Sequence, residues 1–463
     1  MKRVTLNIED FFEVPTAIIY NPDELKPVSN VSIDSRKVKK GSLFIAIKGK
    51  RYDGHNFVRD AINNGAIAAV VNRGKLKEFD DVELPLITVK NTTKALGDIA
   101  RMWRNKLNAV VIGLTGSTGK TSVKDMMTTL LKEKYRVQKT ESNNNNNIGV
   151  PLTILSANEK HDVLVAEVGT NHFGEIEYST NILEPDYALI TNIGSSHLEF
   201  LKSKKGVLKE KIALFNEAKR RCGKILINYD DPMLKQYADK FSNSISYGIN
   251  KRADISGRVI SYTDEGKPVV ELKYKNRKIG NLLPLAGKLS ADNYMAAAAV
   301  ALELGLTNEQ IKNGTKKLSV TEKRLNIIHL KNFLLIDDTY NANPDSVKAA
   351  IELVARIKTY NRKVLILGDM FELGKNKIML HRSLSSPITK NKMDEIYTIG
   401  SGMKALSDSL KNKKLIVKHF RTRKLLENFL GDYNSDNTVI LVKGSRRMRM
   451  EDFVKIILTK AKK

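Results

Sequence analysis

Hydrophobic positions follow two patterns along the chain. Short apolar runs rich in β-branched residues predict buried strands, and stretches with apolar residues at helical spacing predict the helices between them. The strand-like runs lie at 42–47, 66–72, 110–114, 162–168, 187–193, 224–228, 333–337, 363–367, 395–399, 415–417 and 438–442. Repeated strand–helix units of this kind predict an α/β fold built on mostly parallel sheets.

The order of these elements divides the chain into three predicted domains. Residues 1–90 form a small α/β unit, residues 91–319 a central unit, and residues 320–463 a doubly wound unit. Residues 257–285 alternate with turn signals, which predicts an antiparallel β-region flanking the central sheet. A length of 463 residues also favours about three domains, each large enough to bury a core.

The central unit begins with a strand, a glycine-bearing loop and a helix. The loop is predicted to bind phosphate, because its glycines let backbone N–H groups turn inward, Lys120 can reach the outer phosphates, and the Thr121 hydroxyl suits Mg²⁺. Leu114 stands where the strict G-x-x-x-x-G-K-[ST] pattern has its first glycine. An ordinary glycine-rich turn is the competing interpretation, but the buried-strand and amphipathic-helix flanks favour the phosphate loop.

Further polar residues follow the neighbouring strands at the same predicted sheet edge. Glu167 ends one strand, and His197 follows the next. A carboxylate at this place can hold the Mg²⁺ of a nucleotide, whereas a strand-end acid or a single histidine can also be structural. The five asparagines at 143–147 indicate either a disordered low-complexity segment or a polar loop that faces the substrate.

The chain carries a formal net charge of +27, which would suit nucleic acid or an anionic membrane. However, the lysines are scattered through every segment, and no Lys/Arg block is interleaved with aromatic residues. We therefore interpret the charge as a solvated surface with some bias towards phosphorylated or carboxylated substrates, and we expect no nucleic-acid partner. The basic stretch 204–220 predicts one helix whose lysines belong to a solvated face.

Cysteine content and hydropathy indicate the compartment. Cys222 is the only cysteine, so no intramolecular disulfide can form. The sequence shows neither a signal-peptide pattern nor an apolar stretch of membrane-spanning length. These features predict a cytoplasmic protein without membrane insertion.

Taken together, the motifs resemble those of the Mur ligase family. The resemblance covers nearly the whole chain and rests on eight stretches in the same order. They are DSRKVKKGSLFIAIKGKRYDGHNF in the first unit, TGSTGKT, NNNNNIGVPLT, EVGTNHFGEI and NIGSSHLEF in the second, and DDTYNANPDS, GDMFELG and KGSRRMRME in the third. The motifs are closest to those of members that add D-alanyl-D-alanine to a UDP-linked muramoyl tripeptide.

The resemblance implies a UDP-substrate domain, a central ATP-binding domain and a Rossmann-like C-terminal domain. It implies catalytic roles for Lys120, His197, Lys211 and Arg324, and Mg²⁺ ligands at Thr121, Glu167, His197 and Lys211. Lys211 corresponds best to a lysine that is carbamylated in this family, and Lys209 is the competing candidate. The implied ATP-binding residues are Thr115, Gly116, Ser117, Thr118, Gly119, Lys120, Thr121, Ser122, Asn293, Arg324, Asp338, Tyr340 and Asn343. The implied substrate-binding residues are Ser35, Arg36, Asp53, His55, Asn145, Asn146, Lys443, Ser445 and Arg446.

The implied reaction couples ATP cleavage to peptide-bond formation. ATP phosphorylates the terminal carboxyl of the UDP-linked tripeptide, and the amine of D-alanyl-D-alanine attacks the acyl phosphate. ATP and Mg²⁺ are the expected cofactors, and a monomer is the expected state. The third peptide residue, diaminopimelate or lysine, stays open.

Three other functions compete with this one. The first is a sibling ligase that adds diaminopimelate or lysine, although the Asp-Asn-Pro-Arg motif of the diaminopimelate-adding members is absent. The second is a nucleic-acid-stimulated P-loop ATPase, which only the charge suggests. The third is a binding module with a degenerate nucleotide site, which the presence of Lys120, Thr121 and Glu167 disfavours.

The sequence also departs from the family pattern. Leu289-Ser290 replaces a His-Asn pair, and Lys323 replaces the glycine that usually precedes the arginine. Asn144 and Asn147 stand where the family has an aromatic residue and a histidine. These differences affect the expected nucleotide and substrate contacts but not the phosphate loop.

Overall fold

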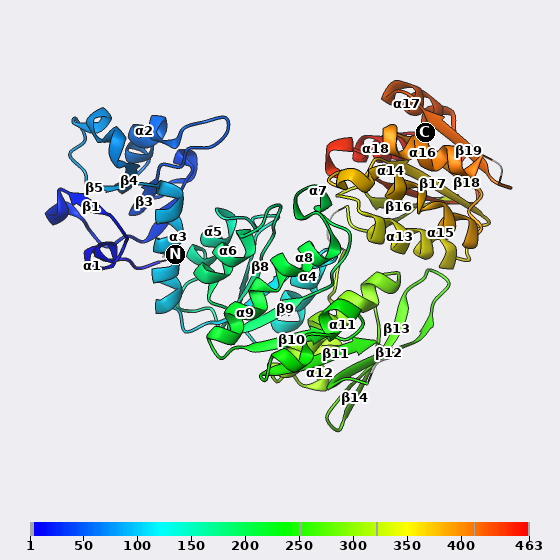
Figure 1. Cartoon of the computed structure of the whole chain (residues 1–463), viewed down its shortest axis with the longest axis horizontal. Coiled ribbons are helices and arrows are strands. Elements are labelled where there is room, and N and C mark those ends of the chain that lie inside the picture. Colours follow the sequence, from blue (N-terminus) through cyan, green and yellow to red (C-terminus); the bar gives the residue numbers. More distant parts are fainter. Residues whose placement is uncertain (1–3, 250–251, 321–322, 412, 462–463) are drawn as a thin grey trace.

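Three β-sheets, each formed by a separate stretch of the chain, organise the computed structural model of the protein (Figure 1). The structure describes residues 4–249, 252–320, 323–411 and 413–461. In Figure 1 the units follow the chain from the blue sheet on the left, through the green centre, to the yellow and red sheet at the upper right. This architecture confirms the predicted α/β class, while the domain bounds at 90/91 and 319/320 stay a prediction.

The first sheet has five strands in the order β1-β5-β4-β3-β2, with only β1 antiparallel to its neighbour among the described strands. The runs predicted at 42–47 and 66–72 form β3 and β4. The elements are α1 (Ile8–Phe12), β1 (Ile18–Tyr20), β2 (Asn30–Ser32), β3 (Ser42–Ile45), α2 (Val58–Asn63), β4 (Ala66–Asn72) and β5 (Leu86–Val89).

The central sheet has nine strands in the order β14-β13-β12-β11-β10-β9-β6-β8-β7. Strands β6 to β12 pair in parallel, and β12, β13 and β14 pair antiparallel, as the alternation at 257–285 predicts. The strands are β6 (Val110–Thr115), β7 (Val137–Lys139), β8 (Val163–Glu167), β9 (Tyr187–Ile190), β10 (Lys224–Asn228), β11 (Ser244–Ile249), β12 (Ile255–Tyr262), β13 (Pro268–Tyr274) and β14 (Arg277–Leu282).

Helices cover both faces of the central sheet, so successive residues of β6 enter different cores: Val111 packs with the cluster under α3, and Ile112 with the cluster under α4 and α11. Burial on both faces explains why β6 is an uninterrupted apolar run. The helices are α3 (Thr92–Lys106), α4 (Lys120–Leu131), α5 (Gly149–Leu155), α6 (Glu175–Leu183), α7 (Leu198–Leu201), α8 (Lys204–Lys211), α9 (Ala213–Arg220), α10 (Pro232–Lys235), α11 (Lys288–Glu303) and α12 (Asn308–Lys316).

The stretch 204–220 corrects a prediction. It forms two helices, α8 and α9, that meet at Ile212, rather than one. Lys211, at the end of α8, is buried, whereas Lys209 is exposed. The solvated-face interpretation is therefore wrong for Lys211, because the end of α8 packs beside the end of β6, where Thr115 lies.

The third sheet has six strands in the order β15-β16-β20-β17-β18-β19, all parallel except β15. Apolar clusters lie on both faces of this doubly wound sheet. The elements are β15 (Asn326–His329), β16 (Phe333–Asp338), α13 (Pro344–Arg356), β17 (Arg362–Gly368), α14 (Lys377–Arg382), α15 (Ser385–Lys390), β18 (Glu395–Ile399), α16 (Ser401–Leu410), β19 (Ile416–Phe420), α17 (Arg423–Asp432), β20 (Thr438–Lys443) and α18 (Glu451–Lys460).

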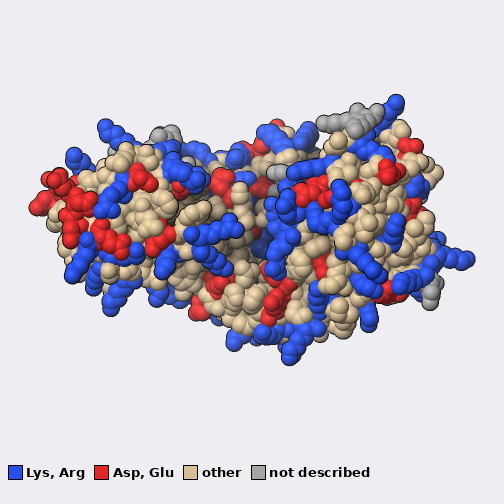
Figure 2. Space-filling view, turned by 90° about the horizontal axis from the view of Figure 1, so that it is seen from above, with Lys and Arg blue, Asp and Glu red and all other residues tan. Residues whose placement is uncertain are grey.

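Two surface observations bear on partners. Figure 2 shows Lys and Arg spread over the whole visible face, with Asp and Glu interspersed among them. Within the described residues, the structure holds no helix that combines the length and the apolar character needed to cross a bilayer.

The central core gives a stability prediction. Phe215 is fully buried on α9 and meets the Phe241 ring edge-on, with 5.6 Å between centroids. We expect Phe215→Ala to lower the free energy of unfolding by about 3–5 kcal/mol, because it leaves a cavity in this core. Fluorescence of Trp103, the only tryptophan, reports unfolding of the same cluster in urea.

The matched control is Phe12→Ala, at a phenylalanine that is 69% exposed. It should change the unfolding free energy by no more than about 0.5 kcal/mol. Equal losses in the two variants would contradict the assignment of Phe215 to the core.

Candidate functional site

The carboxyl ends of the central and C-terminal sheets meet at a cleft with a cavity volume of about 670 Å³. Ligands of doubly wound proteins bind at such strand ends. The central domain contributes the phosphate loop, the asparagine loop and the segments after β8 and β9, and the C-terminal domain contributes the segments after β16, β17 and β20. The two domains therefore form one site together.

Close packing fixes the shape of the phosphate loop. Gly116 has φ +156° and Gly119 has φ +84°, and an added Cβ would lie 1.8 Å from Thr191 Oγ1 and 2.2 Å from Asn293 Oδ1, respectively. Only glycine fits at either position. Asn192 binds the loop further, because its carbonyl accepts from Ser117 N–H at 3.0 Å and its side-chain oxygen accepts from Thr118 N–H at 3.0 Å.

The structure also explains the missing first glycine of the motif. Leu114 is still within β6, where it pairs with Glu167 of β8 and is fully buried in the core. The loop begins only after Thr115. A leucine at position 114 therefore belongs to the strand and leaves the loop unchanged.

Lys120 opens α4 and faces the cleft. Its ammonium donates to the Gly116 carbonyl at 2.8 Å. Burial lowers its pKa, Glu167 acts in the opposite direction, and the charge of Arg324 lowers it further. The first amides of α4 have no carbonyl partners within the helix, so the loop and helix together offer donors and positive charge to an anion.

Glu167 lies beside the loop with an unsatisfied oxygen. Its Oε1 accepts from Asn145 Nδ2 at 2.8 Å, whereas Oε2 is buried without a hydrogen bond, 4.0 Å from Lys124 Nζ. Thr121, at the start of α4, is also buried and accepts from Arg324 at 3.0 Å. A buried carboxylate oxygen without a hydrogen bond and a hydroxyl that line the same cleft fit a hard cation, which prefers oxygen ligands.

These residues alone do not make a complete metal cage. Among the described residues, no three His, Cys, Asp or Glu side chains are grouped as a metal would require. Glu167, His197 and the Thr121 hydroxyl provide a partial set on the cleft wall. The set suits a Mg²⁺ that also binds nucleotide phosphates and water.

Lys211 lies under the phosphate loop, with its ammonium 3.5 Å from Thr115 Oγ1. Burial holds its pKa well below its usual value, and the charge of Lys120 lowers it further. This environment therefore disfavours the charged ammonium form relative to an exposed lysine. Lys209 is exposed instead and lies over the Phe173 ring, 5.9 Å from its centroid.

The C-terminal side of the cleft carries a buried ion pair and a stacked arginine. Lys443 Nζ lies 2.5 Å from Asp338 Oδ2, and both side chains are almost fully buried. Arg324 stacks on Tyr340, with its guanidinium carbon 3.9 Å from the ring centroid. Because it also donates to Thr121, Arg324 connects the C-terminal domain to the phosphate loop.

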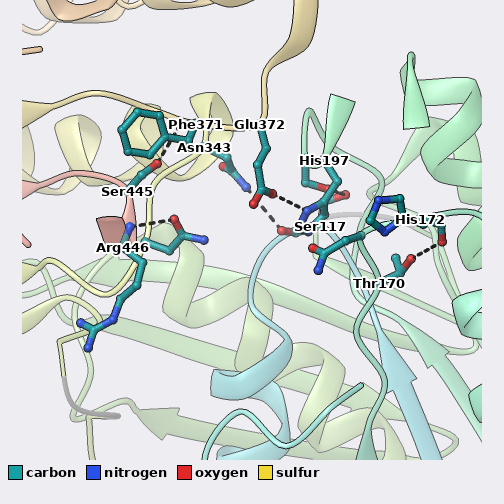
Figure 3. Close-up of polar contacts among 12 residues, drawn as sticks. Ser117, Thr170, His172, His197, Asn343, Phe371, Glu372, Ser445 and Arg446 are labelled. Atoms are coloured by element: carbon teal, nitrogen blue, oxygen red, sulfur yellow. Dashed lines mark hydrogen bonds and ion pairs between the residues drawn. The ribbon is translucent and has the colours of Figure 1, made fainter. Parts of the chain in front are cut away.

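Asn343 makes a further contact between the two domains, and Ser445 and Arg446 make contacts within the C-terminal domain (Figure 3). Asn343 caps α13 and donates to Thr118 Oγ1 at 3.2 Å. Ser445 accepts from Phe371 N–H at 2.9 Å, and Arg446 pairs with Glu451 at 2.9 Å. These contacts arrange the C-terminal loops opposite the phosphate loop.

The asparagine run is an ordered loop. Besides contacting Glu167, Asn145 accepts from Gly169 N–H at 2.7 Å through its carbonyl. Asn146 Oδ1 accepts from the N–H of Ile148, which precedes α5, at 3.2 Å and from the N–H of Gly149, its first residue, at 2.8 Å. Both asparagines line the cleft, together with Asn293 and Ser122. The run is therefore a polar loop that faces the cleft, and its contact with a substrate stays a prediction.

The predicted residues of the first domain do not line this cleft; of that domain's described residues, only Lys50 does. His55 is buried, with Nδ1 2.6 Å from Asp53 and Nε2 accepting from Asn72 N–H at 2.9 Å. Ser35 is buried, and Arg36 is exposed beside Asp34. His55 therefore holds its loop in place, and any substrate contact by these residues stays a prediction.

The sequence interpretation missed several residues of the site. Lys124 is buried one helical turn after Lys120, Asn192 binds the loop, and Glu372 contacts His197 from the other domain. The helical spacing of Lys120 and Lys124 was a usable signal. Glu372 offered none, because 175 residues separate it from His197.

Sequence comparison places the site in a known family. Three family models match the chain. They are described as "Mur ligase family, catalytic domain" over residues 27–104, "Mur ligase middle domain" over 114–301 and "Mur ligase, glutamate ligase domain" over 323–446. The chain belongs to the Mur ligase family. The family resemblance drawn from its motifs is thereby confirmed.

Individual Mur ligases match over most or nearly all of the chain. The UDP-N-acetylmuramoyl-tripeptide--D-alanyl-D-alanine ligase of Bacillus subtilis (strain 168) is 34% identical over 462 residues, which cover 99% of each chain. The Escherichia coli (strain K12) enzyme of the same name is 34% identical and covers 92% of this chain and 93% of its own.

Solved structures of Mur ligases share the fold. A crystal structure of MurF from Acinetobacter baumannii matches with a TM-score of 0.88 and 28% identity, covering 98% of this chain and 99% of that chain. MurF ligase from Thermotoga maritima in complex with ADP matches with a TM-score of 0.82 and 28% identity, covering 94% and 98%.

Proposed function

We propose that this Mur ligase uses ATP to join D-alanyl-D-alanine to a UDP-N-acetylmuramoyl tripeptide. The observation that carries the proposal is the cleft, in which a phosphate loop faces the carboxyl ends of a second sheet in a chain that matches ligases of this name along its whole length. The ADP complex of the Thermotoga maritima relative supports ATP as the nucleotide. We also propose a monomer, because residues of one chain line both sides of the cleft, and a location in the cytoplasm.

The chemistry must overcome the poor electrophilicity of a carboxylate. In the proposed reaction, a carboxylate oxygen of the tripeptide attacks the γ-phosphorus of ATP and releases ADP. The amine of D-alanyl-D-alanine then attacks the carbonyl carbon of the acyl phosphate. The tetrahedral intermediate loses phosphate, and the nitrogen loses a proton, which leaves a peptide bond.

The residues of the cleft suit the first of these steps. Lys120, Arg324 and the first amides of α4 face the place where the transferred phosphoryl group would develop charge. Tyr340 and Thr121 hold Arg324 in place by stacking and hydrogen bonding. Contact between the two domains would keep these groups together around the nucleotide.

We further propose that Thr121, Glu167, His197 and a carbamylated Lys211 hold Mg²⁺. Bound Mg²⁺ would neutralise phosphate charge and hold oxygens of the reactants in place. The depressed pKa of Lys211 supports its carbamylation, because only a neutral amine attacks carbon dioxide. Exposed Lys209 lacks that environment.

Lys120 provides the first functional test. We expect Lys120→Ala to lower the ligation rate by on the order of 10²-fold or more, because a phosphate contact is lost where charge develops. Binding of the UDP-linked tripeptide, measured by calorimetry, should stay largely intact. The control is Lys132→Ala at the exposed C-cap of the same helix, and near-normal turnover of Lys120→Ala would exclude the assignment.

Lys211 provides the second test. We expect Lys211→Ala to be inactive and to recover part of its activity when a small carboxylate such as acetate is added, since the added anion replaces the carbamate. Lys209→Ala should retain its activity without additives. Full activity of Lys211→Ala, or loss of activity in Lys209→Ala with rescue by acetate, would reject Lys211 as the modified residue.

A substrate assay tests the function itself. We expect ADP release from ATP only when a UDP-linked tripeptide and D-alanyl-D-alanine are both present, because the acyl phosphate is consumed only by the amine. Offering the diaminopimelate-containing and the lysine-containing tripeptide separately identifies the third residue. If ATP is instead consumed with a UDP-linked dipeptide and free diaminopimelate or lysine, the chain is a sibling ligase.

A further inference from the structure

The segment from Gly194 to Glu199 belongs to the central domain but is held by the C-terminal domain. Ser195 N–H donates to Asp345 Oδ2 at 3.0 Å, and Glu199 N–H donates to the Glu372 carbonyl at 3.0 Å. The packing is close, since a Cβ on Gly194 would lie 2.5 Å from Asp345 Oδ2. Both ends of this segment are therefore tied to the opposite side of the cleft.

His197, in the middle of this segment, is held through its side chain as well. Its Nδ1 lies 2.6 Å from Glu372 Oε2, and Figure 3 shows the Glu372 side chain reaching from the C-terminal domain towards the imidazole. An ionised carboxylate only accepts hydrogen bonds, so Nδ1 must carry the proton. The neutral ring then has its free lone pair on Nε2.

The backbone at both residues supports a constrained arrangement. His197 has φ 52° and Glu372 has φ 62°. Both angles lie in the left-handed region, which residues other than glycine adopt rarely. Such conformations persist where the surrounding structure enforces them, and they concentrate at functional sites. The same two residues also line the cleft.

We propose that Glu372 is a positioning residue that fixes the Nδ1–H tautomer of His197 and directs Nε2 into the cleft. The inference rests on the metal role of His197 in the proposed function, because a carboxylate commonly orients a metal-binding histidine in this way. Since Glu372 lies on the C-terminal domain, His197 is oriented only when the two domains are in contact. Domain closure would thereby complete the cation site.

Histidine nitrogen NMR tests the tautomer directly, without metal or substrate. In protein labelled with ¹⁵N-histidine, we assign the His197 signals by their loss in His197→Gln. The wild type should show a protonated Nδ1, and Glu372→Ala should lose that signature because the acceptor is gone. Glu372→Gln should keep it, since the amide oxygen still accepts. An unchanged tautomer in Glu372→Ala would overturn the proposal.

Two control variants separate orientation from loosening of the interface. Asp345→Ala removes the other side-chain contact to the segment without touching the imidazole, so the tautomer should stay as in the wild type. Glu309→Gln changes an exposed glutamate in the first turn of α12 and should behave as the wild type throughout. Loss of the tautomer in Asp345→Ala would show that general loosening suffices, and would reject a specific role for Glu372.

Metal binding provides the second readout. With ADP present, Glu372→Ala should bind Mn²⁺ roughly 10- to 100-fold more weakly by calorimetry, as expected when the partner of a metal-binding histidine is removed. The double variant with His197→Ala should bind no more weakly than His197→Ala alone, because both changes remove one unit. Normal Mn²⁺ binding by Glu372→Ala together with weak binding by His197→Ala would reject the positioning role of Glu372 but leave the metal role of His197 in place. Normal binding by His197→Ala would reject its proposed metal role.

Discussion

The cleft depends on the contact between the phosphate loop and the end of β9. Thr191 and Asn192 bind the loop from one side, and Asn293 of α11 approaches Gly119 from the other. The segment after β9 and the helix α11 therefore hold the loop before any ligand binds. A loop fixed in this way loses little conformational entropy on binding, which favours recognition of a highly charged ligand.

The cations around this loop are close together and poorly solvated. The charge of Lys120 lowers the pKa of Lys211, and the charge of Arg324 lowers the pKa of Lys120. Buried Glu167 raises the pKa of both lysines, and Glu210 also raises that of Lys211. A site of this kind has a positive potential, which favours the binding of a polyphosphate or the formation of a carbamate.

Much of the fold could be predicted from the sequence, because local patterns determined it. The apolar runs became β3, β4, β6, β8 and the other strands, and the glycine-bearing turn became the phosphate loop. The break of helix 204–220 at Ile212 and the burial of Lys211 could not be predicted, since they depend on where β6 lies relative to α8. Likewise, the contact of Glu372 with His197 depends on how two domains meet, and no local pattern encodes that.

Apolar packing joins the first two domains much more extensively than the second and third. One cluster runs without interruption from the first sheet through α3 into the central sheet. Among the described residues, only two members of these clusters pack across the boundary between the central and third domains. Ala286 of the central domain belongs to the cluster of the third domain, and Leu380 of the third domain packs against the central cluster. Separating the first two domains would expose apolar surface to water, which is unfavourable. The polar contacts to the third domain can be replaced by hydrogen bonds to water with only a small loss of free energy. The third domain should therefore separate from the central domain more readily than the first domain does, which would open the cleft between them.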